Sequence, residues 1–196
     1  MLMVLTPSAM MPLGFSALDF SLLDVSTGKR ISLADFQDKK ALLIMFICRH
    51  CPYVRHVQEE IAIIGRDYRN SQLGIAAISS NDIEEYANDA PASLKEMAEE
   101  LGFTFPYLYD ETQEVAKKYK AACTPDFFLF DSERKLVYRG QFDDSRPGNN
   151  IPVTGKDLRG AIEAILNDSK VDPHQKPSVG CNIKWKQGNS PEYFAR

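Results

Sequence analysis

Two cysteines separated by two residues, Cys48 and Cys51, are the part of the sequence best suited to chemistry. They lie in the segment Ile47-Cys-Arg-His-Cys-Pro-Tyr53, between an apolar run and an amphipathic one. A C-x-x-C pair where a strand meets a helix is typical of redox-active dithiols, because one turn closes a small disulfide ring. The N-terminus of the helix stabilises a thiolate there. We interpret Cys48 and Cys51 as a catalytic dithiol that works through a mixed disulfide.

The residues around the pair supply support for a thiolate. Arg49 and His50 lie between the cysteines and bring cationic groups close to the sulfurs, although His50 could equally be a solvated loop residue. Pro52 suits the first position of a helix, which would make Cys51 the N-cap and give its sulfur the strongest help from the helix dipole.

The other two cysteines have open roles. Cys123 precedes Pro125 by two residues and is either a third redox thiol or a buried structural cysteine. Cys181 lies in a segment rich in Pro and Gly, where a mobile thiol would suit a resolving role. We favour the alternative, that apolar neighbours of Cys181 anchor this segment to the domain.

The elements that must position the dithiol have clear patterns. The apolar run Ala41–Ile47 predicts a central strand covered on both faces. Val54, Val57, Ile61 and Ile64 then follow at intervals of three and four residues, which predicts an amphipathic helix. The cysteines therefore lie between a buried strand and the start of a helix.

The rest of the chain predicts a mixed sheet with helices on both faces, an α/β fold. We expect an N-terminal β-hairpin, a second buried strand, a helical insertion and a late hairpin followed by a helix capped by Thr154. The predicted segments are Leu18–Leu22, Arg30–Leu33, Leu73–Ser79, Pro91–Leu101, Pro106–Tyr109, Glu111–Tyr119, Phe127–Phe130, Leu136–Arg139 and Thr154–Leu166. Residues 1–14 form an N-terminal extension, 15–167 the domain and 168–196 an irregular C-terminal tail.

Composition limits the class of protein. A chain of 196 residues is long enough for one domain with additional terminal segments, at about 150 residues per domain. A net charge of −4 gives no basic surface for nucleic acid or an anionic membrane. The longest strongly apolar stretch, Ala41–Cys48, is too short to span a bilayer, and no secretory signal precedes it. We expect a cytoplasmic protein with no cofactor and no resident metal, in which a close cysteine pair is catalytic rather than structural.

The C-x-x-C segment, together with Cys123-Thr-Pro125 before a strand, resembles the thioredoxin-fold superfamily. The resemblance implies that the Thr124–Pro125 bond is cis and that this loop faces the cysteine pair. It also implies that Cys48 attacks and Cys51 resolves. The insertion at 81–101 and the N-terminal hairpin resemble the peroxiredoxin-like or redoxin branch, that of alkyl hydroperoxide reductase and thiol-specific antioxidant proteins.

Several positions depart from these relatives. Thioredoxins carry a buried Asp six residues before the first cysteine, where this chain has Leu42. Peroxiredoxins carry Thr or Ser three residues before the peroxidatic cysteine and Pro seven before it. Counting back from Cys51 gives Cys48 and Ile44, although Cys51-Pro52 does match their Cys-Pro pair. The sequence therefore combines features of both groups.

The sequence is compatible with three functions and with a binding protein that has no redox activity. The first is a thiol–disulfide oxidoreductase, acting on a disulfide-bearing protein or a small thiol and reduced by thioredoxin or a low-molecular-weight thiol. The second is a peroxiredoxin-like antioxidant peroxidase that reduces hydroperoxides through a sulfenate. The third is a protein that binds Cu or Zn through Cys48, His50, Cys51 and either Cys123 or Cys181, with His174 as a distal candidate. A thioredoxin-fold binding module without redox activity is the last alternative.

Overall fold

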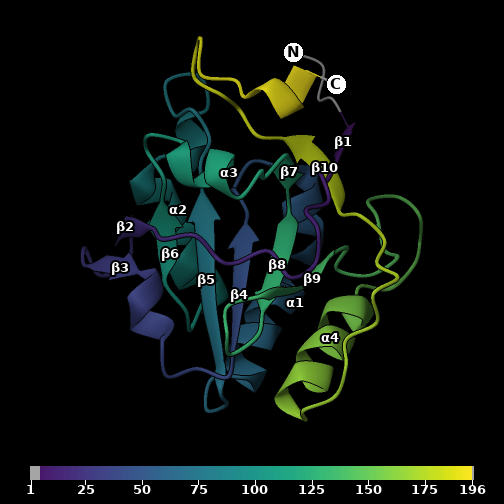
Figure 1. Cartoon of the computed structure of the whole chain (residues 1–196). Helices are drawn as coiled ribbons and strands as arrows, with labels where there is room; N and C mark the ends of the chain where they lie inside the picture. Colours follow the sequence, from purple (N-terminus) through teal and green to yellow (C-terminus); the bar gives the residue numbers. More distant parts are fainter. Residues whose placement is uncertain (1–4, 196) are drawn as a thin grey trace.

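Strand β4 (Ala41–Phe46) is central in a seven-stranded sheet and is buried along its whole length, as its apolar run predicts. The computed structural model describes residues 5–195 (Figure 1). The strand order is β3-β2-β6-β5-β4-β8-β9, with β4, β5 and β6 parallel and the other pairs antiparallel. The other strands of this sheet are β2 (Ser21–Asp24), β3 (Arg30–Ser32), β5 (Leu73–Ser79), β6 (Tyr107–Tyr109), β8 (Asp126–Phe130) and β9 (Leu136–Gly140). The predicted α/β architecture with a mixed sheet is confirmed.

Helices cover both faces of this sheet, because side chains of β4 alternate between two cores. Leu43 and Met45 pack with α1, α2 and α4, whereas Leu42 and Ile44 pack on the opposite face with α3. The helices are α1 (Pro52–Asp67), α2 (Pro91–Leu101), α3 (Glu114–Lys118) and α4 (Lys156–Leu166), with short 3-10 turns η1 (Leu33–Phe36), η2 (Ala87–Asp89) and η3 (Glu192–Ala195). No helix in the described part of the chain has the length and apolar character needed to cross a membrane.

A small second sheet joins segments from both ends of the described chain. Strand β10 (Val179–Asn182) lies between β1 (Leu5–Pro7) and β7 (Cys123–Thr124), and both pairs are antiparallel. Figure 1 shows the yellow β10 beside the purple β1 and the green β7. The segment 168–196 was expected to be irregular, and this strand corrects that expectation. Residues 1–4 of the predicted extension lie outside the described residues.

The ends of α2 lie where the sequence predicted them, whereas the N-cap of α4 does not. Pro91 begins α2, and Gly102 ends it with a positive φ of 64°, as predicted. The N-cap of α4 is Gly155 and not Thr154. The Thr154 and Gly155 amides instead donate to Asp143 Oδ2, at 2.7 Å each. The Asp143 carboxylate that binds these amides is buried.

Candidate active site

The two cysteines of the C-x-x-C segment lie in the turn between β4 and α1, as predicted. Cys51 is the N-cap of α1 and Pro52 is its first residue. Proline fits this position because it lacks the N–H that would remain without a helical partner. Cys48 is 1% exposed and Cys51 is 0% exposed, and both are free thiols. The pair is therefore at the positive end of the α1 dipole and shielded from solvent.

Thr124, the last residue of β7, faces both sulfurs. The Thr124–Pro125 peptide bond is cis, as the resemblance implied. The Thr124 hydroxyl is 3.4 Å from Cys48 Sγ. The Thr124 carbonyl is 3.2 Å from Cys51 Sγ and accepts the S–H of the neutral thiol. The predicted contact between this loop and the cysteine pair is thus present.

The surroundings of Cys51 favour its thiolate. Hydrogen bonds from the Cys181 and Cys48 thiols lower the pKa of Cys51 far below its ordinary value, with help from the Thr124 hydroxyl and the Val54 amide. Cys51 makes no regular capping hydrogen bond, so the Val54 amide acts on the sulfur mainly by its dipole. The Thr124 carbonyl and burial oppose the thiolate, but four donors outweigh them.

The other three cysteines keep their protons. Burial raises the pKa of Cys48 well above its ordinary value, and its hydrogen bond to Cys51 adds to the rise. Burial likewise raises the pKa of Cys123. The pKa of Cys181 is raised by its hydrogen bond to Cys51 and by burial. Cys51 is thus the cysteine of the site whose pKa is lowered, and the pKa values of the other three are raised.

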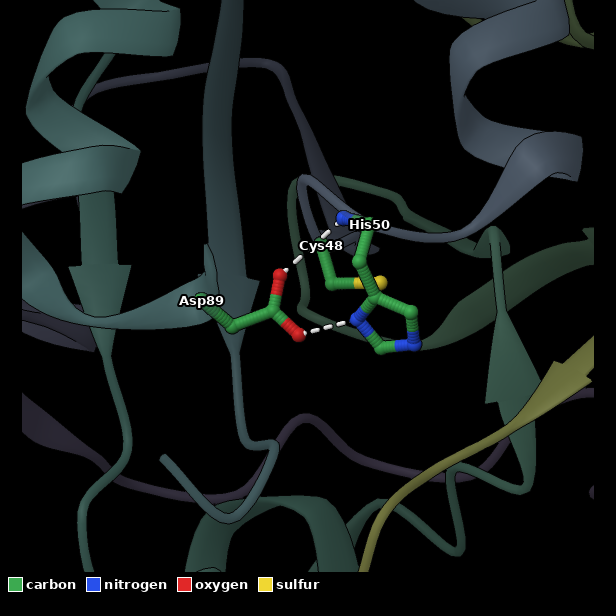
Figure 2. Close-up of side chains that lie close together, drawn as sticks. All are labelled: Cys48, His50 and Asp89. Atoms are coloured by element: carbon green, nitrogen blue, oxygen red, sulfur yellow. Dashed lines mark hydrogen bonds and ion pairs between the residues drawn. The ribbon is translucent and has the colours of Figure 1, made fainter. Parts of the chain in front are cut away.

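His50 is held beside Cys48 by a buried carboxylate from the insertion (Figure 2). Nδ1 of His50 is hydrogen-bonded to Oδ2 of Asp89, which is the last residue of η2 and is fully buried. A ring nitrogen of His50, the Asp89 carboxylate and Cys48 Sγ all lie within 4.8 Å of one another. The ring also stacks on Tyr86, with centroids 4.9 Å apart. His50 is therefore a positioned group and not a solvated loop residue.

Asp89 is occupied as a hydrogen-bond acceptor. Its Oδ1 accepts the Arg49 amide at 2.8 Å and the His50 amide at 3.2 Å. Its Oδ2 accepts the Asn81 side-chain amide at 2.8 Å in addition to the His50 ring. These four contacts fix the loop between the cysteines and leave the carboxylate poorly placed for a metal ion. His174 is exposed beside Asp172 and does not join this cluster.

Arg49 was expected to bring its positive charge to the sulfurs, but its guanidinium is bound elsewhere. Its guanidinium binds Glu96 at 2.9 Å and Glu100 at 3.1 Å, both on α2, and donates to the Ser93 carbonyl. With two carboxylates beside it, the charge is neutralised at α2 and not at the dithiol. Arg49 instead links the cysteine loop to the insertion.

The two remaining cysteines lie on neighbouring strands. Cys123 is fully buried in β7, and its thiol faces the Pro125 carbonyl at 3.7 Å. Cys181 is in β10, where its Cα pairs with that of Thr124, and its sulfur contacts Cys51. The tail is anchored through a strand, as we favoured for Cys181, but its cysteine also reaches the dithiol.

Asp89, Asn81 and Tyr86 were not identified as site residues from the sequence. All three lie in or next to the insertion, where no hydrophobic period indicates their side-chain directions. Only the packing of η2 against the cysteine loop brings them to His50. A polar cluster immediately before the Pro91 helix start was the one available hint.

Comparisons with known proteins agree with this architecture. A family model described as the AhpC/TSA family matches residues 13–139. The crystal structure of an uncharacterized conserved protein from Geobacillus kaustophilus is 53% identical, with a TM-score of 0.93, covering 95% of this chain and 98% of that one. A hypothetical protein from Sinorhizobium meliloti is 48% identical, with a TM-score of 0.92, covering 93% of this chain and 100% of that one.

A more distant structure confirms the thioredoxin-like fold. The thioredoxin domain of a thiol-disulfide oxidoreductase from Bacteroides vulgatus is 22% identical, with a TM-score of 0.62, and the match covers 81% of this chain and 100% of that one. A comparison with curated proteins finds no match.

Proposed function

The chain belongs to the AhpC/TSA family, and we propose that it is a thiol–disulfide oxidoreductase that cycles a Cys48–Cys51 dithiol and disulfide. The observation that carries this proposal is the environment of Cys51. A sulfur at the start of α1 with four donors around it has the low pKa that a nucleophilic thiolate requires.

In the first step, the Cys51 thiolate attacks one sulfur of a substrate disulfide. A Cys51–substrate disulfide forms, the substrate S–S bond breaks, and the second substrate sulfur leaves with the electron pair. This order reverses the roles implied by the resemblance to thioredoxins, because hydrogen bonds lower the pKa of Cys51 whereas burial raises the pKa of Cys48.

In the second step, Cys48 attacks the Cys51 sulfur. The Cys48 proton passes to His50, the Cys48–Cys51 disulfide forms, and the remaining substrate sulfur leaves as a thiolate with the electron pair of the broken Cys51–substrate bond. Asp89 acts as a positioning residue that holds the His50 ring next to Cys48, in the same way that a third group orients the base of a nucleophile–base pair.

His50 lies at the edge of a polar cavity. This cavity of about 470 Å³ lies between α1 and α2 and is also lined by Arg55 and Gln58. The His50 side chain is 16% exposed, whereas that of Asp89 is fully buried. The ring thus borders both the Cys48 sulfur and this cavity. A thiol reductant returns the disulfide to the dithiol.

The test measures reduction of a protein disulfide and of hydrogen peroxide with dithiothreitol as electron donor. We expect disulfide reduction by the wild type, loss of it in Cys51→Ser, and accumulation of a mixed disulfide on Cys51 when Cys48→Ser is combined with Cys181→Ser, which removes both thiols beside Cys51. Cys123→Ser is the matched control and keeps activity, because this buried cysteine faces the Pro125 carbonyl. Peroxide consumption well above the free-thiol rate, without disulfide reduction, would replace this proposal with the peroxidase.

A further inference from the structure

Cys181 is the nearest unused thiol to the proposed nucleophile. Its Cα pairs with that of Thr124, whose carbonyl oxygen lies 3.2 Å from Cys51 Sγ, and its hydrogen bond to Cys51 lowers the pKa of Cys51. Cys181 is 2% exposed and is a free thiol. The Cys51 sulfur thus has thiol partners on two sides, Cys48 from its own loop and Cys181 from β10.

The first turn of α1 serves both of these sulfurs. Pro52 has no N–H, and the next two amides, those of Tyr53 and Val54, lie beside Cys181 and Cys51 respectively. Backbone N–H groups at the start of a helix have no helical partner and carry its positive partial charge. A thiolate on either sulfur therefore meets the same stabilising end of α1.

Gly180 allows β10 to approach this closely. A Cβ at position 180 would lie 2.0 Å from the Thr124 carbonyl oxygen and 2.8 Å from the Thr124 carbonyl carbon. No side chain fits there unless β10 moves away from β7. The glycine next to Cys181 is thus required for the position of the third sulfur.

Lys184 brings a positive charge to the same region. It is 6% exposed, and its Nζ donates to Asn182 Oδ1 at 2.7 Å and lies 5.5 Å from the Tyr86 ring centre. Among residues 5–195, no ion pair is formed by this ammonium group. Its charge favours a thiolate on Cys181.

We propose that Cys181 is a third redox thiol that exchanges with the Cys48–Cys51 disulfide. The Cys181 thiolate attacks the Cys51 sulfur, the Cys51–Cys181 bond forms, and the Cys48–Cys51 bond breaks. The electron pair leaves on Cys48, which takes up the proton that Cys181 released. The exchange has no net oxidation or reduction, so it needs only the disulfide of the proposed function, on which this inference rests.

The exchange replaces the disulfide within the cysteine loop by a disulfide between that loop and the C-terminal tail. Cys48 becomes a free thiol again beside His50, while the oxidised pair links α1 to β10. The same sulfur, Cys51, takes part in both bonds and is the exchange point.

The test uses the full chain with Cys48→Ser, reacted with glutathione disulfide and mapped by mass spectrometry without reduction. We expect glutathione on Cys51 to be replaced by a Cys51–Cys181 bridge. Adding Cys181→Ser should lengthen the lifetime of the Cys51–glutathione form about tenfold or more, whereas adding Cys123→Ser should leave it unchanged. A stable Cys51–glutathione form in Cys48→Ser alone would overturn the exchange and leave the proposed function intact.

Failure of the proposed function has a different result. If Cys51 accepts no glutathione in Cys48→Ser or in the variant that combines Cys48→Ser with Cys181→Ser, Cys51 is not the nucleophile and both proposals are wrong. Gly180→Ala supplies a second measurement that keeps all four cysteines. It should lower the yield of the Cys51–Cys181 bridge in oxidised protein and preserve the Cys48–Cys51 bridge. Equal yields of the Cys51–Cys181 bridge with Gly and Ala at position 180 would contradict the argument from β10.

Discussion

At the scale of single residues, four thiols with the same chemistry have different protonation because their neighbours differ. Cys51 accepts hydrogen bonds from two other cysteines, whereas Cys48, Cys123 and Cys181 are buried and keep their protons. The difference depends mainly on these two hydrogen bonds, with a smaller contribution from the Val54 amide at the start of α1. The reduced site therefore concentrates its charge on one atom.

This distribution predicts one thiolate per chain at pH 7 in the reduced protein. The lowered pKa of Cys51 keeps it ionised as the pH falls below the ordinary thiol range, and the raised pKa values keep the others neutral. Thiolate absorbance near 240 nm, followed by pH titration, should show this single thiolate and its loss in Cys51→Ser. A wild-type protein whose absorbance rises only above about pH 8.5 would contradict the assignment.

Asp89→Asn should slow the second step by about 10- to 100-fold, because the His50 ring loses the carboxylate that orients it as a proton acceptor. The measurement is the lifetime of a mixed disulfide on Cys51 as a function of pH. Alkaline pH should restore the rate in Asp89→Asn, since the Cys48 thiolate then forms without a base.

The control for Asp89 is Asp143→Asn. Asp143 is also buried and accepts backbone amides, from Ser145, Thr154 and Gly155, but it lies at the start of α4. We expect lower stability and an unchanged mixed-disulfide lifetime. If both variants slow the step equally and neither recovers at high pH, Asp89 has only a structural role.

At the scale of elements, the start of α4 depends on a glycine and not on the predicted cap. Gly155 has a φ of 63°, and an added Cβ would lie 2.9 Å from the Phe142 ring. Gly148 has a φ of 86° with nothing within 4 Å of an added Cβ. The two glycines share a left-handed backbone and differ in the space around them.

Gly148→Ala should therefore cost about 1–2 kcal/mol of unfolding free energy, from backbone strain alone. Gly155→Ala should cost more, because overpacking against Phe142 adds about 1–3 kcal/mol. Urea denaturation of both variants measures the difference. Equal losses would show that the Phe142 ring moves aside freely.

Local sequence patterns were enough to predict the two elements that flank the dithiol. The apolar run of β4 and the stripe of Val54, Val57, Ile61 and Ile64 predicted a strand and a helix that the structure contains. The cap of α4 was missed because Asp143, eleven residues earlier, binds the amide of Thr154. A contact made by the tertiary fold decided that helix start.

At the scale of the whole molecule, the Arg139–Asp126 pair joins separate parts of the chain. Both side chains are fully buried, and Asp126 directly follows the cis Pro125. Arg139 also donates to Ser8 Oγ at 2.9 Å and to the Lys120 carbonyl at 2.8 Å. One guanidinium thus connects β8 and β9 with the segment after β1 and the loop before β7.

Arg139→Met should destabilise the fold by about 3–5 kcal/mol, because the Asp126 carboxylate remains buried without a counter-charge. Chemical denaturation is the measurement, and Asp126→Leu in the same chain should restore part of the loss. Arg159→Met is the control, since Arg159 pairs with Glu60 and Asp67 at a partly exposed site and should cost about 1 kcal/mol or less. Equal losses of unfolding free energy in the two variants would mean that burial does not determine how much these ion pairs stabilise the fold.

The long-range part of the site could not be predicted from the sequence. β1, β7 and β10 are two to four residues long and carry no period, so their pairing depends on strand partners far away in the chain. Cys181 was recognised as a candidate but its contact with Cys51 was not, because composition indicates a loop there. Asp89 was missed for the same reason: its role arises where two distant segments meet.

The position of β10 also has a consequence during synthesis. Its neighbours β1 and β7 are made long before residues 179–182, so the small sheet cannot close until these residues have left the ribosome. Until then the growing chain has the C-x-x-C turn but lacks the strand that brings Cys181 and Lys184 beside it. The nascent chain would carry an unfinished redox centre, and release of the last strand would set the moment at which its full reactivity begins.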